Sequence, residues 1–145
     1  MDTLTSEQRS ELMSRIRSRD TQPELRVRRL VHALGYRYRL YVGSLPGRPD
    51  LVFPGRGKAI FIHGCFWHRH LKCPMGSRVP KSRLDFWLPK LEGNGKRDLR
   101  NLRRLRRLGW SVMVVWECQT RSKRLEALTR RIVRFLGEAR GRAPS

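Results

Sequence analysis

The sequence predicts an α/β protein in which a mixed β-sheet is flanked by helices. Two observations support this class. Apolar residues recur at helical spacing near both ends of the chain and in a basic stretch before Gly109, and four short apolar runs have the length of strands. A length of 145 residues suits one domain, and we expect a single domain over residues 1–145.

Two helices are expected first. Residues 5–18 place three apolar side chains on one side of a helix: Leu12, Met13 and Ile16. Residues 21–35 follow as a second helix, with Thr21 as its N-cap and Gly35 at its end.

The sheet is expected from four runs. Residues 36–42 alternate and predict a strand with one exposed face. Residues 50–53 and 58–62 are separated by the turn sequence PGRG and predict a hairpin at the centre of the sheet. Residues 110–117 predict a buried strand, whereas prolines and glycines exclude long regular elements from residues 64–82.

Two more helices complete the order. Residues 96–108 predict a basic helix whose leucines face inward: Leu99, Leu102, Leu105 and Leu108. Residues 122–137 predict the last helix, and residues 138–145 a flexible tail.

The charge is strongly biased. Lys and Arg number 33 against 12 Asp and Glu, giving a net charge of +21. This excess predicts a polyanionic partner, with nucleic acid favoured, although an arginine-rich composition is an alternative source. No apolar run reaches the roughly 18 residues of a membrane span, and the first ten residues lack the apolar core of a signal peptide. We expect a cytoplasmic protein without membrane contact, in which the cysteines bind metal or stay free.

A metal site is expected in the stretch HGCFWHRHLKC. Cys65, His70 and Cys73 have the ligand types that Zn²⁺ prefers, and Cys118 completes a set of four if its strand lies beside the hairpin. Such a closed site is structural, because no position remains for substrate. The alternative is three buried thiols and a surface histidine.

A second set of residues suits phosphodiester hydrolysis. Asp50 begins the central hairpin and is a hard oxygen ligand for Mg²⁺, and the backbone carbonyl of Ile62 is a second possible contact. His63 and His68 are candidate acid or base, because imidazole titrates near neutrality. Alternatively, Asp50 is a turn residue and His68 supports the zinc ligands. The Pro-Asp pair and following strand are similar to PD-(D/E)xK nucleases, with Phe61-Ile62-His63 in place of the second carboxylate and lysine.

In order along the chain, the segments SRIRSRDTQPE, SLPGRPDLVF, IFIHGCFWHRHLKC, DFW, GNGKRDLRNLRRLRRLGW and VVWEC closely resemble the very short patch repair (Vsr-type) DNA mismatch endonucleases. The resemblance implies a restriction-endonuclease-like fold with a structural zinc site held by the Cys₃His set above. It also implies a Mg²⁺-dependent nick 5′ to the thymine of a T·G mismatch, which arises when 5-methylcytosine deaminates.

The resemblance also implies residue roles. Asp50 would bind the metal, His68 would be the general base, and His63 would assist near the phosphate. Glu24 would orient the catalytic histidine or a water, although its place three residues after Thr21 is equally that of a capping-box glutamate. Ile62 stands where some family members carry a hydroxyl residue; a carbonyl contact would survive that difference.

The aromatic residues inside the metal loop suggest how a mismatch is detected. Wedging apolar side chains into duplex DNA costs least at a weakened step. We expect Phe66 and Trp67 to be such wedges, with Trp87 a third and Met13, in an N-terminal DNA-contacting helix over residues 1–20, a fourth. Ordinary core packing is the alternative. Phosphate contacts are expected from the helix at 96–108.

Two other functions stay open: a related restriction-like or nicking endonuclease with a different target, and a zinc-stabilised DNA-binding protein without catalysis. We expect a monomer, since a single nick needs one active site. Mismatch-repair proteins are possible partners.

Overall fold

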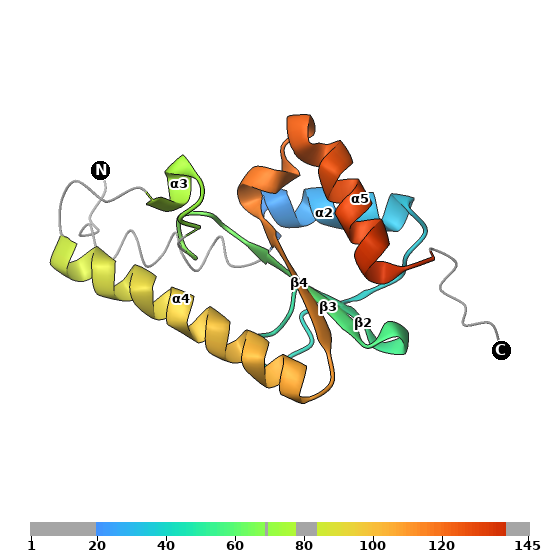
Figure 1. Ribbon diagram of the computed structural model, residues 1–145, viewed down its shortest axis with the longest axis horizontal. Coiled ribbons are helices and arrows are strands. Elements are labelled where there is room, and N and C mark those ends of the chain that lie inside the picture. Colours follow the sequence, from blue (N-terminus) through green and yellow to red (C-terminus); the bar gives the residue numbers. More distant parts are fainter. Residues whose placement is uncertain (1–19, 69, 78–83, 139–145) are drawn as a thin grey trace, which may run out of the picture.

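The computed structural model describes residues 20–68, 70–77 and 84–138 (Figure 1). The helix expected at 5–18, with Met13, and nearly all of the tail expected at 138–145 lie outside the described residues. The elements, in chain order, are α2 (Gln22–Ala33), β1 (Arg39–Leu40), β2 (Leu51–Phe53), η1 (Pro54–Arg56), β3 (Lys58–His63), α3 (Pro74–Ser77), α4 (Leu84–Arg107), β4 (Ser111–Trp116), η2 (Glu117–Thr120), η3 (Ser122–Arg124) and α5 (Leu125–Leu136). This mixture of helices and strands confirms the α/β class.

The four strands form one mixed sheet in the order β1-β2-β3-β4. Strand β2 is antiparallel to both β1 and β3, while β4 runs parallel to β3. The hairpin at the sheet's centre is therefore confirmed, and Gly57 closes its turn at a φ of 65° that favours glycine. Because His63 lies opposite Trp116 in the parallel pair, the segments after β3 and β4 leave the sheet at the same edge.

Helices α2 and α5 cover one face of the sheet, and α4 lies on the other side (Figure 1). The core between the sheet and helices α2 and α5 is apolar. Among its most buried members are Val27, Val31, Leu51, Phe53, Ile60, Val115, Leu128, Ile132 and Leu136. The predicted final helix is confirmed as α5, preceded by the short helix η3. None of the described helices is both long and apolar enough to cross a membrane.

Helix α4 differs from its prediction in length and in orientation. It begins at Leu84, with Pro89 inside it, whereas the sequence analysis began it at residue 96. The predicted inward positions of Leu99 and Leu108 were wrong, since these side chains are 55% and 63% exposed. Leucines spaced three residues apart do not stay on one side of a helix, because a turn takes 3.6 residues. Leu99 and Leu108, which are nine residues apart, therefore lie on opposite sides. The buried side runs instead through Leu91 and Leu105.

The predicted strand at 36–42 is much shorter. Only Arg39–Leu40 pairs with β2, and Tyr41 has a φ of 50°, which ends the extended conformation. Tyr36 is buried and donates a hydrogen bond to the carbonyl of Gly137 after α5, so the start of this segment belongs to the helical side of the core.

Candidate active site and metal centre

The side chains assigned to catalysis gather around one cleft of about 810 Å³ beside the hairpin. Glu24 comes from the first turn of α2, Asp50 from the residue before β2, His63 from the end of β3 and His68 from the loop that follows. Helix α4 contributes to the same cleft. The structure therefore brings together four residues that span 45 positions of sequence, from Glu24 to His68.

Asp50 is bound to the neighbouring strand. Its Oδ2 accepts a hydrogen bond of 2.6 Å from the backbone N–H of Ile62. The N–H and C=O of one strand residue point to the same neighbour, so the carbonyl of Ile62 also faces the side on which Asp50 lies. Burial, and next a hydrogen bond with Glu24, raise the pKa of Asp50 well above its usual value. A buried carboxyl of this kind is stabilised in its charged form by a cation.

Glu24 serves the helix and the cleft at once. Its Oε2 accepts hydrogen bonds from the Thr21 backbone N–H at 2.7 Å and from Oγ1 at 3.0 Å, and the Thr21 hydroxyl caps the Glu24 N–H in return. The capping box predicted as an alternative is therefore present. The same carboxyl is only 3% exposed and interacts with Asp50, so the cap does not remove it from the site.

His63 and His68 stack face to face. Their ring centroids are 4.1 Å apart and their planes differ by 6°. His63 is buried, and its Nδ1 has no hydrogen-bond partner among the described residues. Burial, and next the charge of His68, lower the pKa of His63 to about 3, which keeps its ring neutral at physiological pH.

Asp98, on α4, is a functional candidate that the sequence analysis missed. Its Oδ2 lies 2.6 Å from Nδ1 of His68. When Nδ1–H donates to this carboxylate, Nε2 keeps its lone pair and the ring has a defined direction, as in a general base oriented by a third group. One signal was visible: Asp98 is the single acidic residue of the basic stretch 96–108.

Helix α4 holds the surrounding loops through one polar seam, formed by Asn94, Asp98 and Asn101. Asn94 donates a hydrogen bond of 2.9 Å to the carbonyl of Trp67, next to the Asp98–His68 pair. Asn101 lies close to Gly47: a Cβ added to Gly47 would be 2.9 Å from the Cβ of Asn101. The spacing of the seam, four and then three residues, is that of one helix face.

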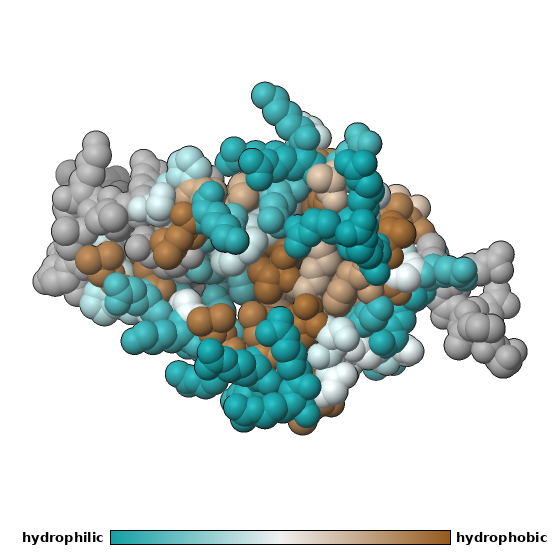
Figure 2. All heavy atoms as spheres, viewed as in Figure 1, coloured by the Kyte–Doolittle hydropathy of each residue, from teal (hydrophilic) through white to brown (hydrophobic). Residues whose placement is uncertain are grey.

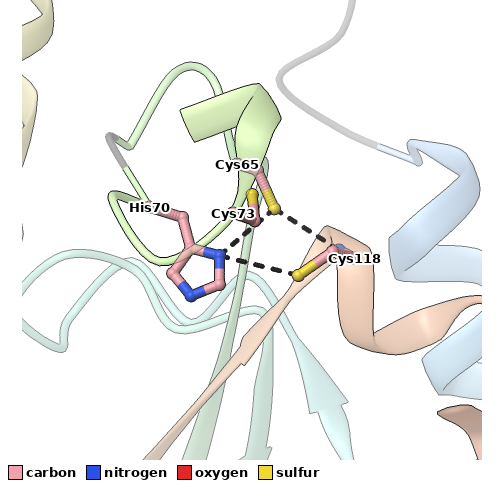
Figure 3. Close-up of side chains that lie close together, drawn as sticks. All are labelled: Cys65, His70, Cys73 and Cys118. Atoms are coloured by element: carbon pink, nitrogen blue, oxygen red, sulfur yellow. Dashed lines mark hydrogen bonds between the residues drawn. The ribbon is translucent and has the colours of Figure 1, made fainter. Parts of the chain in front are cut away.

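The Cys and His residues form a compact cluster. The ligand atoms of Cys65, His70, Cys73 and Cys118 all lie within 4.8 Å of one another. Nδ1 of His70 is 3.6 Å from the sulfur of both Cys65 and Cys118. Figure 3 shows three of these residues on the loop after β3 and Cys118 on the segment after β4. Parallel pairing of the two strands thus produces a set of atoms suited to a metal ion.

The aromatic residues expected to contact DNA lie together. Trp67 is 5.1 Å from Phe66 and 5.8 Å from Trp87, measured between ring centroids, and Phe66 is 6.1 Å from Trp87. All three are half-buried and none belongs to the main core. By contrast Trp116, in the strand predicted to be buried over residues 110–117, is half-buried, and its ring stacks on His70 with the centroids 4.3 Å apart.

Comparison with known proteins identifies the family. Residues 1–74 match the family model described as DNA mismatch endonuclease Vsr. A DNA mismatch endonuclease Vsr of Escherichia coli is 44% identical over 131 residues, which cover 88% of this chain and 83% of the relative. The chain belongs to the Vsr family of DNA mismatch endonucleases.

Two further relatives extend the match. A type II nicking enzyme of Xanthomonas oryzae is 52% identical over 118 residues, covering 81% of this chain and 85% of the relative. A type II nicking enzyme of Neisseria meningitidis is 41% identical over 136 residues, covering 90% and 96%. As a Vsr-family endonuclease, the protein hydrolyses phosphodiester bonds and takes DNA as its substrate.

Charge is distributed unevenly over this Vsr-family protein. Hydrophilic side chains crowd the outer side of α4, along the lower margin of Figure 2. The exposed cations of this helix are Lys96, Arg97, Arg100, Arg103, Arg104, Arg106 and Arg107. The cleft is different, because five carboxylates line it: Asp20, Glu24, Asp50, Asp98 and Glu117. A basic helix surface that attracts polyanions therefore lies beside an acidic centre suited to a divalent cation.

Proposed function

We propose that the protein nicks one DNA strand on the 5′ side of the thymine in a T·G mismatch left by deamination of 5-methylcytosine, and so begins very short patch repair. The observation that carries the proposal is the shared cleft, in which the Asp50 carboxyl, the His68–Asp98 pair and Trp67 of the aromatic cluster meet. Family membership and the mismatch endonuclease of E. coli support this substrate.

Mg²⁺ is the proposed catalytic cofactor, and Asp50 and the carbonyl of Ile62 would hold it. The residues fit a hard cation, because the half-buried carboxyl of Asp50, whose pKa is raised, stands beside a second carboxyl, that of Glu24. When bound, the ion supplies positive charge for the phosphoryl oxygens. Glu24 holds the Asp50 carboxyl and orients a water or the catalytic histidine.

His68 acts as the general base in this proposal. Asp98 fixes Nδ1, so Nε2 takes the proton of the attacking water. His63 assists beside the phosphate as a neutral ring stacked on His68. The ligand atoms of both histidines and Asp98 lie within 4.8 Å of one another. However, the two imidazole rings are stacked in parallel, and the lone pair of each ring nitrogen lies in the plane of its own ring. One metal ion cannot lie in both planes, so it cannot be bound well by both histidines. We therefore assign the histidines to proton transfer.

Zn²⁺ is the proposed occupant of the Cys₃His cluster. Three thiols and an imidazole are a donor set that zinc prefers, and four ligands leave no position for substrate. Burial raises the pKa of the Cys65 thiol, so a metal is what would hold this sulfur as a thiolate. Bound zinc would tie the loop carrying Phe66, Trp67 and His68 to the end of β4.

The aromatic cluster is the proposed mismatch detector. Half-buried rings can enter a weakened base step when a loop anchored at both ends carries them, as with Phe66 and Trp67, or when a helix does, as with Trp87 on α4, whereas rings in the core cannot. Phe66, Trp67 and Trp87 would act from the described surface. Met13 would act from the N-terminal helix, which lies outside the described residues.

A nicking endonuclease with another target is the second candidate, favoured by the relatives named type II nicking enzymes. Duplexes that differ only in T·G, C·G or A·T at one position, assayed with Mg²⁺ on denaturing gels, separate the candidates. We expect one cut, 5′ to the mismatched thymine. Equal cutting of all three duplexes favours the second candidate. The restriction-endonuclease-like classification, the cytoplasmic location, the monomeric state and mismatch-repair partners remain predictions.

A further inference from the structure

Arg48 is the exception in the acidic cleft. Among the described residues that line the cleft, it is the single Lys or Arg beside five Asp and Glu residues. A DNA phosphate that approaches this centre meets carboxylate oxygens of its own sign. The side chain of Arg48 is therefore the one permanent positive charge of the described lining that can offset a phosphate.

The backbone at Arg48 is held in an unusual conformation. Its φ is 49°, in the left-handed region that residues with a Cβ rarely adopt. Its N–H donates a hydrogen bond of 3.1 Å to the carbonyl of Leu45. The preceding residue, Gly47, also has a positive φ of 77° and lies against Asn101 of α4. The turn is thus determined by contacts on both sides, which is typical of strain kept at a functional site.

The guanidinium of Arg48 is available for a ligand. The residue is exposed, and no hydrogen bond or ion pair with another described residue engages its side chain. The Nε of Arg48 lies 3.7 Å from the position that a Cβ on Gly43 would occupy. In contrast Arg28 already donates hydrogen bonds to Asp20 and Tyr41, two residues of the cleft lining.

We propose that Arg48 binds the non-bridging oxygens of the phosphate at the cut or of the phosphate next to it. Arg48 precedes Asp50 by two residues, so their Cα atoms are at most about 7 Å apart. The planar fork of an arginine matches two phosphate oxygens. The turn pinned by Asn101 presets the direction of the side chain, and Pro49 connects it to Asp50. This inference rests on the proposed placement of the cleaved phosphate beside Asp50.

Neutral phosphate analogues test the contact. A set of duplexes carries one methylphosphonate each, at successive positions around the nick, and binding is measured with Ca²⁺ in place of Mg²⁺. We expect one linkage at or beside the nick to weaken wild-type binding about ten-fold. Arg48→Ala should bind unmodified DNA about ten-fold more weakly than the wild type does. A methylphosphonate at the sensitive linkage should not weaken the binding of this variant further. Its salt slope should fall by about 0.9.

Two variants are the controls. Arg134→Ala removes another exposed arginine, from α5, which lies on the sheet face opposite α4, and should keep the wild-type methylphosphonate pattern. Arg48→Lys should recover part of the affinity, because charge is restored without the fork. Thermal unfolding and zinc content verify that each variant is folded.

The proposal is overturned if Arg48→Ala retains the wild-type penalty at every linkage, or if Arg134→Ala reproduces its pattern. Failure of the proposed function is recognised separately, because T·G preference and cut position are read from the wild-type enzyme. The methylphosphonate scan can then be run on whichever duplex that enzyme nicks.

Discussion

The imidazole Nδ1 of His68 and the Oδ2 of Asp98 lie 2.6 Å apart, although 30 residues separate them in the chain. His68 belongs to the loop after β3, which also carries Phe66 and Trp67, and Asp98 belongs to helix α4, which lines the cleft. The pair gives His68 a fixed direction and leaves Nε2 available for the general-base role that we propose for it. It is also a contact that sequence patterns did not reveal.

Asp98→Asn should lower the nicking rate about 100-fold or more, because an amide no longer stabilises the correctly oriented, protonated imidazole. DNA affinity should change little. Single-turnover rates and equilibrium binding to the same T·G duplex measure the two quantities. The matched control is Glu92→Gln, which removes an exposed carboxylate from the same helix. A wild-type rate in Asp98→Asn would show that the pair is only structural.

Asp50→Asn should abolish nicking while binding persists, since the amide oxygen is a poor substitute for the carboxylate as a cation ligand. Without Mg²⁺, and with equal zinc content in both proteins, its melting temperature should equal or exceed that of the wild type. The reason is that burial and the Glu24 contact already disfavour the charged carboxyl. Calorimetry in Mg²⁺-free buffer checks this. A strongly destabilised variant would contradict the idea that the carboxyl is kept for metal. The comparison variant is Leu51→Ala, which creates a cavity in the adjacent core. It should lower the free energy of unfolding by about 2–5 kcal/mol.

His70→Ala should lower the zinc content and the melting temperature together, because the loop after β3 loses its attachment to Cys118. Metal analysis of the purified protein and thermal unfolding give the two readouts. His32→Ala removes an exposed histidine of α2 outside the cluster and should leave both unchanged. Full zinc content in His70→Ala would remove this residue from the ligand set.

Trp67→Ala should reduce the opening of DNA at the mismatch more than it reduces overall affinity, because one wedge is lost and the phosphate contacts stay. The fluorescence of 2-aminopurine beside the T·G pair reports unstacking. Leu71→Ala is the control, since Leu71 is 65% exposed in the same loop. Unchanged fluorescence with Trp67→Ala would assign the ring to packing within the aromatic cluster.

The sequence by itself determined the class of fold, the central hairpin, the α5 helix and most of the residues that gather at the candidate site, with Asp98 the exception. These features depend on local rules, such as the turn at PGRG and the capping box at Thr21, or on residue types with few alternative uses, such as the cysteines. The resemblance to Vsr-type enzymes rested on the same local segments, and the family comparisons confirm it.

Tertiary structure decided which of these residues meet. Which side of α4 faces the protein, here called the phase of the helix, depends on what its whole length packs against. Leu99 and Leu108 are therefore exposed, while Leu91 and Leu105 are buried. The same phase aims Asp98 at His68 and places Asn101 against Gly47. Parallel pairing of β3 with β4 brings Cys118 to Cys65. A helix period or strand alternation specifies one face of one element, whereas a contact between distant elements depends on how all of them pack together.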